Sequence, residues 1–255
     1  SYRPNHDVAC CAGQVNRIMP NFAARMWLRA EPDTIVAAMY GPSRITARLG
    51  NPPRKVTITQ QTDYPFSERI DFTIHTAKPI RFGLTLRIPA WCRKACLLIN
   101  DKPSRPKRLT PATFVKIRRL FRDQDRITLI LPMQIKLTRW PKAGLGIERG
   151  PLVYALPIEE DRQIDKRTSP SNKKFPALNL YPASPWNYAL ALDAKSLKTN
   201  VQLIQRPVGS LNPWSLETAP VQLLVPARRV RNWKIVRPKV IESFRDGRVR
   251  KIKGR

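Results

Sequence analysis

Residues 69–88 read RIDFTIHTAKPIRFGLTLRI, and this stretch decides the fold class. Its first part places Ile70, Phe72 and Ile74 at every second position with polar residues between them, and its second part repeats the pattern from Phe82 to Ile88. Alternation of this kind predicts strands with one buried and one exposed face. Because two such runs are separated by a few residues including Pro79, we expect neighbouring strands of a β-rich fold.

The same alternation continues on both sides of this stretch, broken by Gly, Pro, Asn and Asp turns. Short strands at this spacing are typical of antiparallel sandwiches and jelly rolls. Strands are predicted first at 34–40, 43–49, 55–61, 69–75, 81–88, 95–100, 113–118 and 126–131. A second β unit would include strands at 150–156, 188–192, 199–205 and 221–227, with a long surface loop over 157–176.

One helix is predicted before the strands. Apolar residues from Val15 to Trp27 follow the spacing of an amphipathic helix, with Pro20 inside it as an expected kink. The prediction is therefore a mainly β chain, with residues 1–30 carrying the helix, a first β-sandwich at 31–133, and a second at 134–255 that ends in a basic tail.

The adjacent thiols Cys10 and Cys11 precede this helix, and three interpretations are open. They could form a strained vicinal disulfide, remain buried and inert, or bind one soft metal ion as thiolates, one of them also serving as a nucleophile. On a strand the two side chains would point to opposite faces, whereas a turn entering a helix lets them share a ligand. The positive helix end would also favour the thiolate form.

Charge, hydropathy and cysteine content limit the other classes of protein to which this chain could belong. The net charge of +29, from 47 basic and 18 acidic residues, would attract nucleic acid non-specifically, but no nucleic-acid-binding motif accompanies it. No apolar run is long enough to span a membrane.

Cys92 and Cys96 are expected to be ordinary thiols, and reduced thiols favour the cytoplasm, although the compartment is not defined. Because the chain begins at Ser1, we expect its true N-terminus to be missing.

Several segments resemble glycoside hydrolase family 127, the β-L-arabinofuranosidase family. The resemblance begins with HDVACCAGQVNRIMPN at residues 6–21 and continues in order along the chain. The further matching segments are 40–43, 62–66, 86–91, 131–133, 148–154, 185–188 and 225–230.

The resemblance implies a C-terminal portion of a retaining glycosidase that acts on an arabinofuranoside-type carbohydrate. It implies that Cys10 is the nucleophile and a zinc ligand, and that Cys11 is a second ligand of one zinc ion. The remaining ligands and the acid/base glutamate would belong to an upstream α/α-barrel, of which the chain would keep only the last helix. The chain alone is therefore expected to be inactive.

His6 lies four residues before Cys10 and is a candidate substrate contact, with a structural turn residue as the alternative. Five tryptophans could stack on sugars but are expected in the core: Trp91, Trp140, Trp186, Trp214 and Trp233. The alternatives for the chain as a whole are a non-catalytic β-sandwich module, carbohydrate-binding or structural, and a basic nucleic-acid-binding protein.

Overall fold

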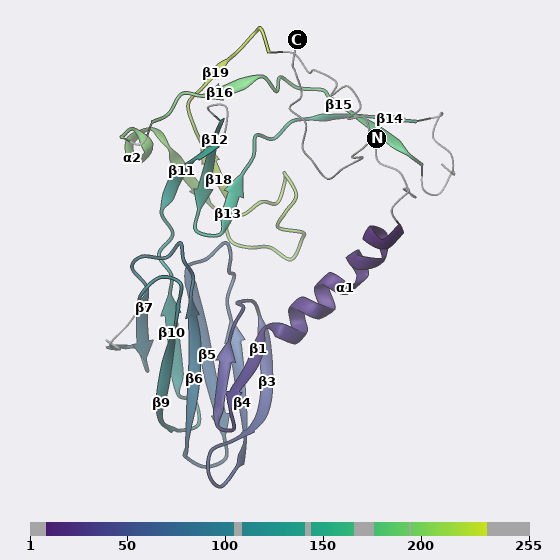
Figure 1. Cartoon of the computed structure of the whole chain (residues 1–255). Helices are drawn as coiled ribbons and strands as arrows, with labels where there is room; N and C mark the ends of the chain where they lie inside the picture. The colour runs from purple at the N-terminus through teal and green to yellow at the C-terminus, as the bar shows by residue number, and fades with distance from the viewer. Residues whose placement is uncertain (1–8, 105–108, 141–143, 166–175, 194, 234–255) are drawn as a thin grey trace, which may run out of the picture.

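The protein is described by a computed structural model that covers residues 9–104, 109–140, 144–165, 176–193 and 195–233. The long helix α1 (Ala9–Arg25) leads into a mainly β chain, and Figure 1 shows it projecting from one end of the first sandwich. The prediction of a β-rich chain preceded by one helix is confirmed. No helix in the described ranges combines the length and apolar character needed to cross a membrane.

Two sheets form the sandwich. The first has the order β1-β2-β6-β9, and the second has the order β3-β4-β5-β10-β7-β8. The strands of the first sheet are β1 (Trp27–Glu31), β2 (Thr34–Ala37), β6 (Ile80–Ile88) and β9 (Thr113–Phe121). Those of the second are β3 (Ser43–Leu49), β4 (Arg54–Gln61), β5 (Arg69–Thr76), β7 (Cys96–Ile99), β8 (Lys102–Ser104) and β10 (Arg126–Ile130).

The core lies between these sheets and is built from the alternating residues of the opening stretch. Ile70, Phe72 and Ile74 of β5 are fully buried, as are Phe82 and Leu84 of β6. Both sets belong to one apolar cluster, so the two strands bring their apolar faces together across the sandwich. This burial of apolar surface is the main stabilising contribution to such a fold.

All eight strands predicted for the first sandwich are present, with ends shifted by a few residues. The helix prediction is wrong at its end, because Trp27 belongs to β1 rather than to α1. One pairing differs from a purely antiparallel sandwich: β2 runs parallel to β6, with Ile35 opposite Leu84. This long-range pairing joins the β1–β2 pair to the β6–β9 pair within the first sheet, and no local sequence pattern specifies it.

The C-terminal part consists of smaller sheets. A three-stranded sheet has the order β11-β12-β13, and three two-stranded ribbons pair β14 with β15, β16 with β19, and β17 with β18. The elements are β11 (Ile135–Trp140), β12 (Gly144–Arg149), β13 (Leu152–Tyr154), β14 (Glu160–Ile164), β15 (Leu178–Pro182), β16 (Tyr188–Leu190), α2 (Leu197–Asn200), β17 (Gln202–Gln205), β18 (Val221–Leu224) and β19 (Ala227–Arg229).

The prediction of a loop over 157–176 is wrong at 160–164, where β14 pairs with β15 in antiparallel register. Every residue of β14 is exposed, so this strand lacks the alternation that reveals half-buried strands. β14 forms as a strand through its pairing with β15, whose first three residues are half-buried.

Candidate functional site

The cysteine pair lies on α1. The helix begins at Ala9, so Cys10 and Cys11 are in its first turn rather than just ahead of it. Successive residues of a helix are separated by about 100° around its axis, whereas successive strand residues point to opposite faces. A helical backbone therefore separates two successive residues by a smaller angle than a strand does. His6, the candidate substrate contact, lies outside the described residues.

The first turn of a helix is a favourable setting for a thiolate. Its backbone N–H groups have no partners within the helix, and the helix dipole places partial positive charge there. No acidic residue lies in the first turn of α1 to offset this charge. Positive partial charge at a helix start stabilises anionic groups in general, and this is the physical basis for expecting a thiolate in this turn.

The donor chemistry of this pair suits zinc, which prefers sulfur and nitrogen ligands in a tetrahedral arrangement. Two cysteines supply only half of such a set. Across the described ranges no three His, Cys, Asp or Glu side chains are grouped as a metal site requires. Cys10 and Cys11 could thus hold zinc together with further ligands, and not as a complete site by themselves.

The other end of α1 is fixed to the sandwich. Met26, directly after the helix, is buried, and its carbonyl accepts hydrogen bonds from the N–H groups of Ala38 and Met39 at 2.9 and 3.3 Å. The Trp27 indole donates to Ser43 Oγ at 3.1 Å and packs edge-on against Phe72, with ring centroids 6.0 Å apart. This anchor was missed in the sequence because both residues continue the apolar spacing of the helix.

The apolar face predicted for the helix is exposed in the described structure. Ile18 and Met19 are 65% and 66% accessible to solvent, and Phe22 is 41% accessible. Pro20 lies within the helix, as expected. Beside it, Asn21 donates from Nδ2 to the Arg17 carbonyl at 2.9 Å, and Arg25 donates to Asn21 Oδ1 at 2.5 Å. The helix is amphipathic, but its apolar side does not face the sandwich core.

Two acidic residues follow the helix, and neither is suited to donate a proton. Lys116 Nζ lies 2.7 Å from Glu31 Oε2, and Arg118 donates to both carboxylate oxygens of Asp33, at 3.1 and 2.5 Å. The hydrogen bond from Lys116 lowers the pKa of Glu31, and that from Arg118 lowers the pKa of Asp33. Both carboxyls therefore stay ionised at neutral pH, which disfavours them as general acids.

Among the residues that the structure describes, the second cysteine pair, Cys92 and Cys96, belongs to no group of three potential metal ligands. Cys92 is buried and Cys96 is exposed, and both are free thiols. Burial raises the pKa of the Cys92 thiol above its ordinary value, which keeps it protonated and unreactive. The structure is consistent with the interpretation of these two residues as ordinary thiols.

Two segments that carry the family resemblance, 131–133 and 148–154, meet Glu68 at one junction, where the three-stranded sheet joins the sandwich. Arg149 is 4% exposed, and its Nη2 lies 3.0 Å from Glu68 Oε1. The same oxygen accepts the Met133 N–H at 2.9 Å, and Arg149 Nη1 contacts Met133 Sδ at 3.3 Å. The turn after β12 needs Gly150, because its φ is +59° and an added Cβ would lie 2.6 Å from Met133 Cγ.

Comparison with known families agrees with this architecture. Residues 34–133 match the sequence model described as "Beta-L-arabinofuranosidase, GH127 middle domain". This part of the chain is a GH127 middle domain. It contains β2 to β10 and nearly the whole sandwich core, so the resemblance inferred from the sequence is confirmed for this part. The anchor of α1 at Met26 and Trp27 lies directly ahead of the GH127 middle domain.

Solved structures share the fold over a wider range. The chain is similar to Ara127N-Se, a GH127 β-L-arabinofuranosidase from Geobacillus stearothermophilus T6, with 22% identity, a TM-score of 0.59 and coverage of 91% of this chain and 33% of that one. It is also similar to another GH127 β-arabinofuranosidase, with 16% identity, a TM-score of 0.52 and coverage of 70% and 35%.

The chain therefore spans about a third of the length of these enzymes. At these identities the similarity establishes a shared fold around the GH127 middle domain. Comparison with curated protein sequences gave no significant match.

Proposed function

We propose that the chain is the C-terminal part of a retaining glycoside hydrolase that acts on arabinofuranosides, with Cys10 as nucleophile and Cys11 as its partner ligand of zinc. The observation that carries this proposal is the GH127 middle domain at residues 34–133. The cysteine pair supports it, because it lies on the helix anchored directly to that domain.

In this mechanism Cys10 Sγ attacks the anomeric carbon, and the bond from that carbon to the leaving oxygen breaks as the oxygen receives a proton. Water then displaces the thiolate from the same carbon, so that two inversions give net retention. Zinc, when bound, would keep both cysteines ionised at neutral pH. The first turn of α1 contributes in the same direction through its free N–H groups.

The mechanism requires an acid/base group, and the described residues near the helix do not provide one. Glu31 and Asp33 are held as carboxylates by Lys116 and Arg118. The acid/base and the remaining zinc ligands are thus proposed to come from outside these 255 residues. The chain alone is expected to be inactive on arabinofuranosides.

The experiment compares the 255-residue chain with the product of the complete reading frame on an aryl β-L-arabinofuranoside. We expect hydrolysis only by the longer protein, with about one zinc per chain measured by elemental analysis. Cys10→Ser should abolish hydrolysis, whereas Cys96→Ser, at an exposed thiol, should leave it unchanged. Full activity of the Cys10→Ser variant would overturn the nucleophile assignment, and absence of zinc from the active protein would overturn the metal assignment.

A further inference from the structure

A cleft of about 480 Å³ lies between the sandwich and the β17–β18 ribbon. One wall is the loop between β4 and β5 with the start of β5, and the other is the end of β17 with residues 206–208 and the start of β18. A volume of this size suits a small ligand. The residues that line the cleft are far apart in the sequence, so the cleft exists only in the folded chain.

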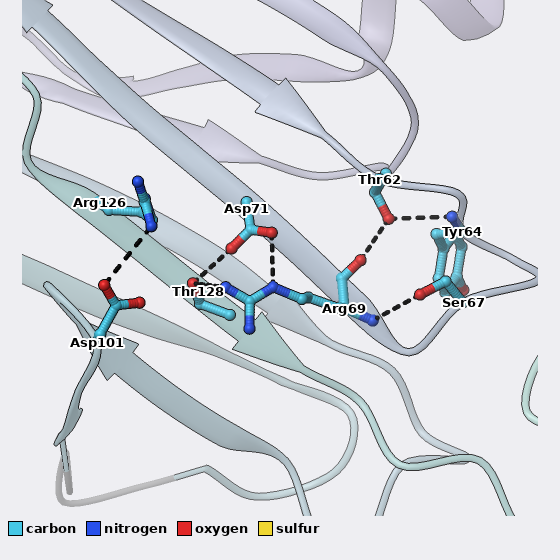
Figure 2. A network of polar contacts seen from close by, with 8 residues as sticks. All are labelled: Thr62, Tyr64, Ser67, Arg69, Asp71, Asp101, Arg126 and Thr128. Carbon is cyan, nitrogen blue, oxygen red and sulfur yellow. Dashed lines mark hydrogen bonds and ion pairs between the residues drawn. The ribbon is translucent and has the colours of Figure 1, made fainter.

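The loop wall is held in place by a network of hydrogen bonds, shown in Figure 2. Thr62 Oγ1 donates to the Arg69 carbonyl at 2.6 Å and accepts the Tyr64 N–H at 3.0 Å, and Ser67 Oγ accepts the Arg69 N–H at 3.3 Å. Within the loop, the Phe66 N–H donates to the Asp63 carbonyl at 2.8 Å. The loop is therefore preorganised, which lowers the entropic cost of binding.

Two aromatic rings provide an apolar surface beside the cleft. Phe66 lines the cleft and packs against Trp214, with ring centroids 4.9 Å apart. Trp214 is 66% exposed, contrary to the expectation that it lies in the core. The backbone N–H of Trp214 donates to Asn212 Oδ1 at 3.1 Å, and Ser215 Oγ lies 2.7 Å from Thr218 Oγ1. These hydrogen bonds order the backbone of the turn that carries the exposed Trp214 ring.

The charges of the cleft compensate one another. Glu68 is paired with Arg149, and Arg69 donates from Nε to Asp71 Oδ2 at 2.7 Å and from Nη2 to Thr128 Oγ1 at 3.2 Å (Figure 2). Among the charged lining residues this leaves Asp63 and Arg206, one of each sign. The net charge of +29 is thus not concentrated here, and the cleft is not built to select a polyanion.

We propose that this cleft binds a neutral saccharide. The exposed Trp214 ring, supported by Phe66, would stack against the apolar face of a sugar ring. The polar groups of Asp63, Gln205 and Arg206 would bond to its hydroxyls, which both donate and accept hydrogen bonds. The inference does not rest on Cys10 or zinc, so it stands or falls separately from the proposed hydrolase chemistry.

The test is isothermal titration of the 255-residue chain with neutral arabino-oligosaccharides and, in parallel, with acidic oligogalacturonides. We expect saturable binding of the neutral probe that changes little with salt. Trp214→Ala should weaken it about three- to tenfold, as expected for loss of one aromatic contact. Trp214→Phe should retain most of the affinity, and Arg206→Gln should weaken it.

Trp140→Ala is the matched control, because Trp140 is 63% exposed on a different sheet. It should bind as the parent chain does, as should Cys10→Ser. The proposal is overturned if no neutral probe binds, if Trp214→Ala binds normally while its circular dichroism is unchanged, if acidic probes bind more tightly with strong salt dependence, or if Cys10→Ser loses binding.

Discussion

Arg149 and Glu68 are 81 positions apart in the chain, and their side chains meet at 3.0 Å where the three-stranded sheet joins the sandwich. Arg149 is buried, whereas the Glu68 side chain is 35% exposed and also accepts the Met133 N–H. One carboxylate oxygen therefore ties β12 to the segment that follows β10. Without the arginine, the partly buried Glu68 carboxylate would lose its positively charged partner and keep only the hydrogen bond from the Met133 N–H.

We expect Arg149→Met to lower the free energy of unfolding by about 2–3 kcal/mol, less than for a fully buried pair because water can reach Glu68. Urea unfolding followed by far-ultraviolet circular dichroism measures the change. Arg162→Met is the control, because its pair with Glu160 is exposed and should contribute at most about 0.5 kcal/mol. Equal losses in the two variants would show that burial of Arg149 is not the cause.

Gly150 sits in the turn beside the same junction. Its φ of +59° disfavours any other residue, and a Cβ would lie 2.6 Å from Met133 Cγ. Gly150→Ala should destabilise the chain by about 1–3 kcal/mol, from backbone strain and displacement of Met133. Thermal unfolding would compare it with Gly209→Ala, where a Cβ meets no atom within 4 Å. A Gly150→Ala variant as stable as the control would contradict this role.

The ion pair of Asp33 with Arg118 predicts a dependence of stability on acid pH. The hydrogen bond from Arg118 lowers the pKa of Asp33 below its ordinary value of 3.8 in the folded state. A carboxyl with a lowered folded-state pKa adds stability at pH values above the ordinary pKa, and this contribution is lost as the pH falls through the folded-state value.

Asp33→Asn should therefore lower stability at neutral pH and reduce the slope of stability against pH below about pH 4. Chemical unfolding at a series of pH values measures both effects. The parent chain, measured in parallel at the same pH values, supplies the reference slope. An unchanged acid slope in Asp33→Asn would show that this pair does not contribute.

The thiols of the sandwich should differ in reactivity. In a Cys10→Ser, Cys11→Ser background, a thiol reagent should modify Cys96 quickly in the native chain, because Cys96 is exposed. Cys92 is buried and burial raises its pKa, so it should react only after unfolding. Stopped-flow labelling in the presence and absence of denaturant would measure how many thiols per chain react quickly in the native state and how many react only after unfolding. Rapid native labelling of both thiols would contradict the buried position of Cys92.

The first sandwich could be predicted from the sequence because its strands are half-buried. Ile70, Phe72 and Ile74 are apolar for the same reason that they are buried, and the polar residues between them face outward. β14 escaped prediction because it is exposed on both faces. β1 escaped because Trp27 continues the helical spacing while its ring belongs to the sandwich.

The candidate sites were predictable to different degrees. The adjacent positions of Cys10 and Cys11 are visible in the sequence itself; the structure places both in α1, and their shared function stays a prediction. The cleft is different, because it joins Phe66, Arg149 and Arg206 from segments that only the folded chain brings together. Trp214 was expected in the core, since composition alone does not distinguish an exposed indole from a buried one.

The anchor of α1 makes the helix a lever with its pivot at Met26. From there to Cys10 the helix extends about 24 Å, so a rotation of about 10° at the pivot would move the cysteine by about 4 Å. Gly41 sets the pivot, because a Cβ there would lie 3.1 Å from Met26 Cε. Small changes in packing around Met26 are thus amplified along the helix, so the position of the Cys10 backbone depends on packing inside the sandwich, at the opposite end of α1.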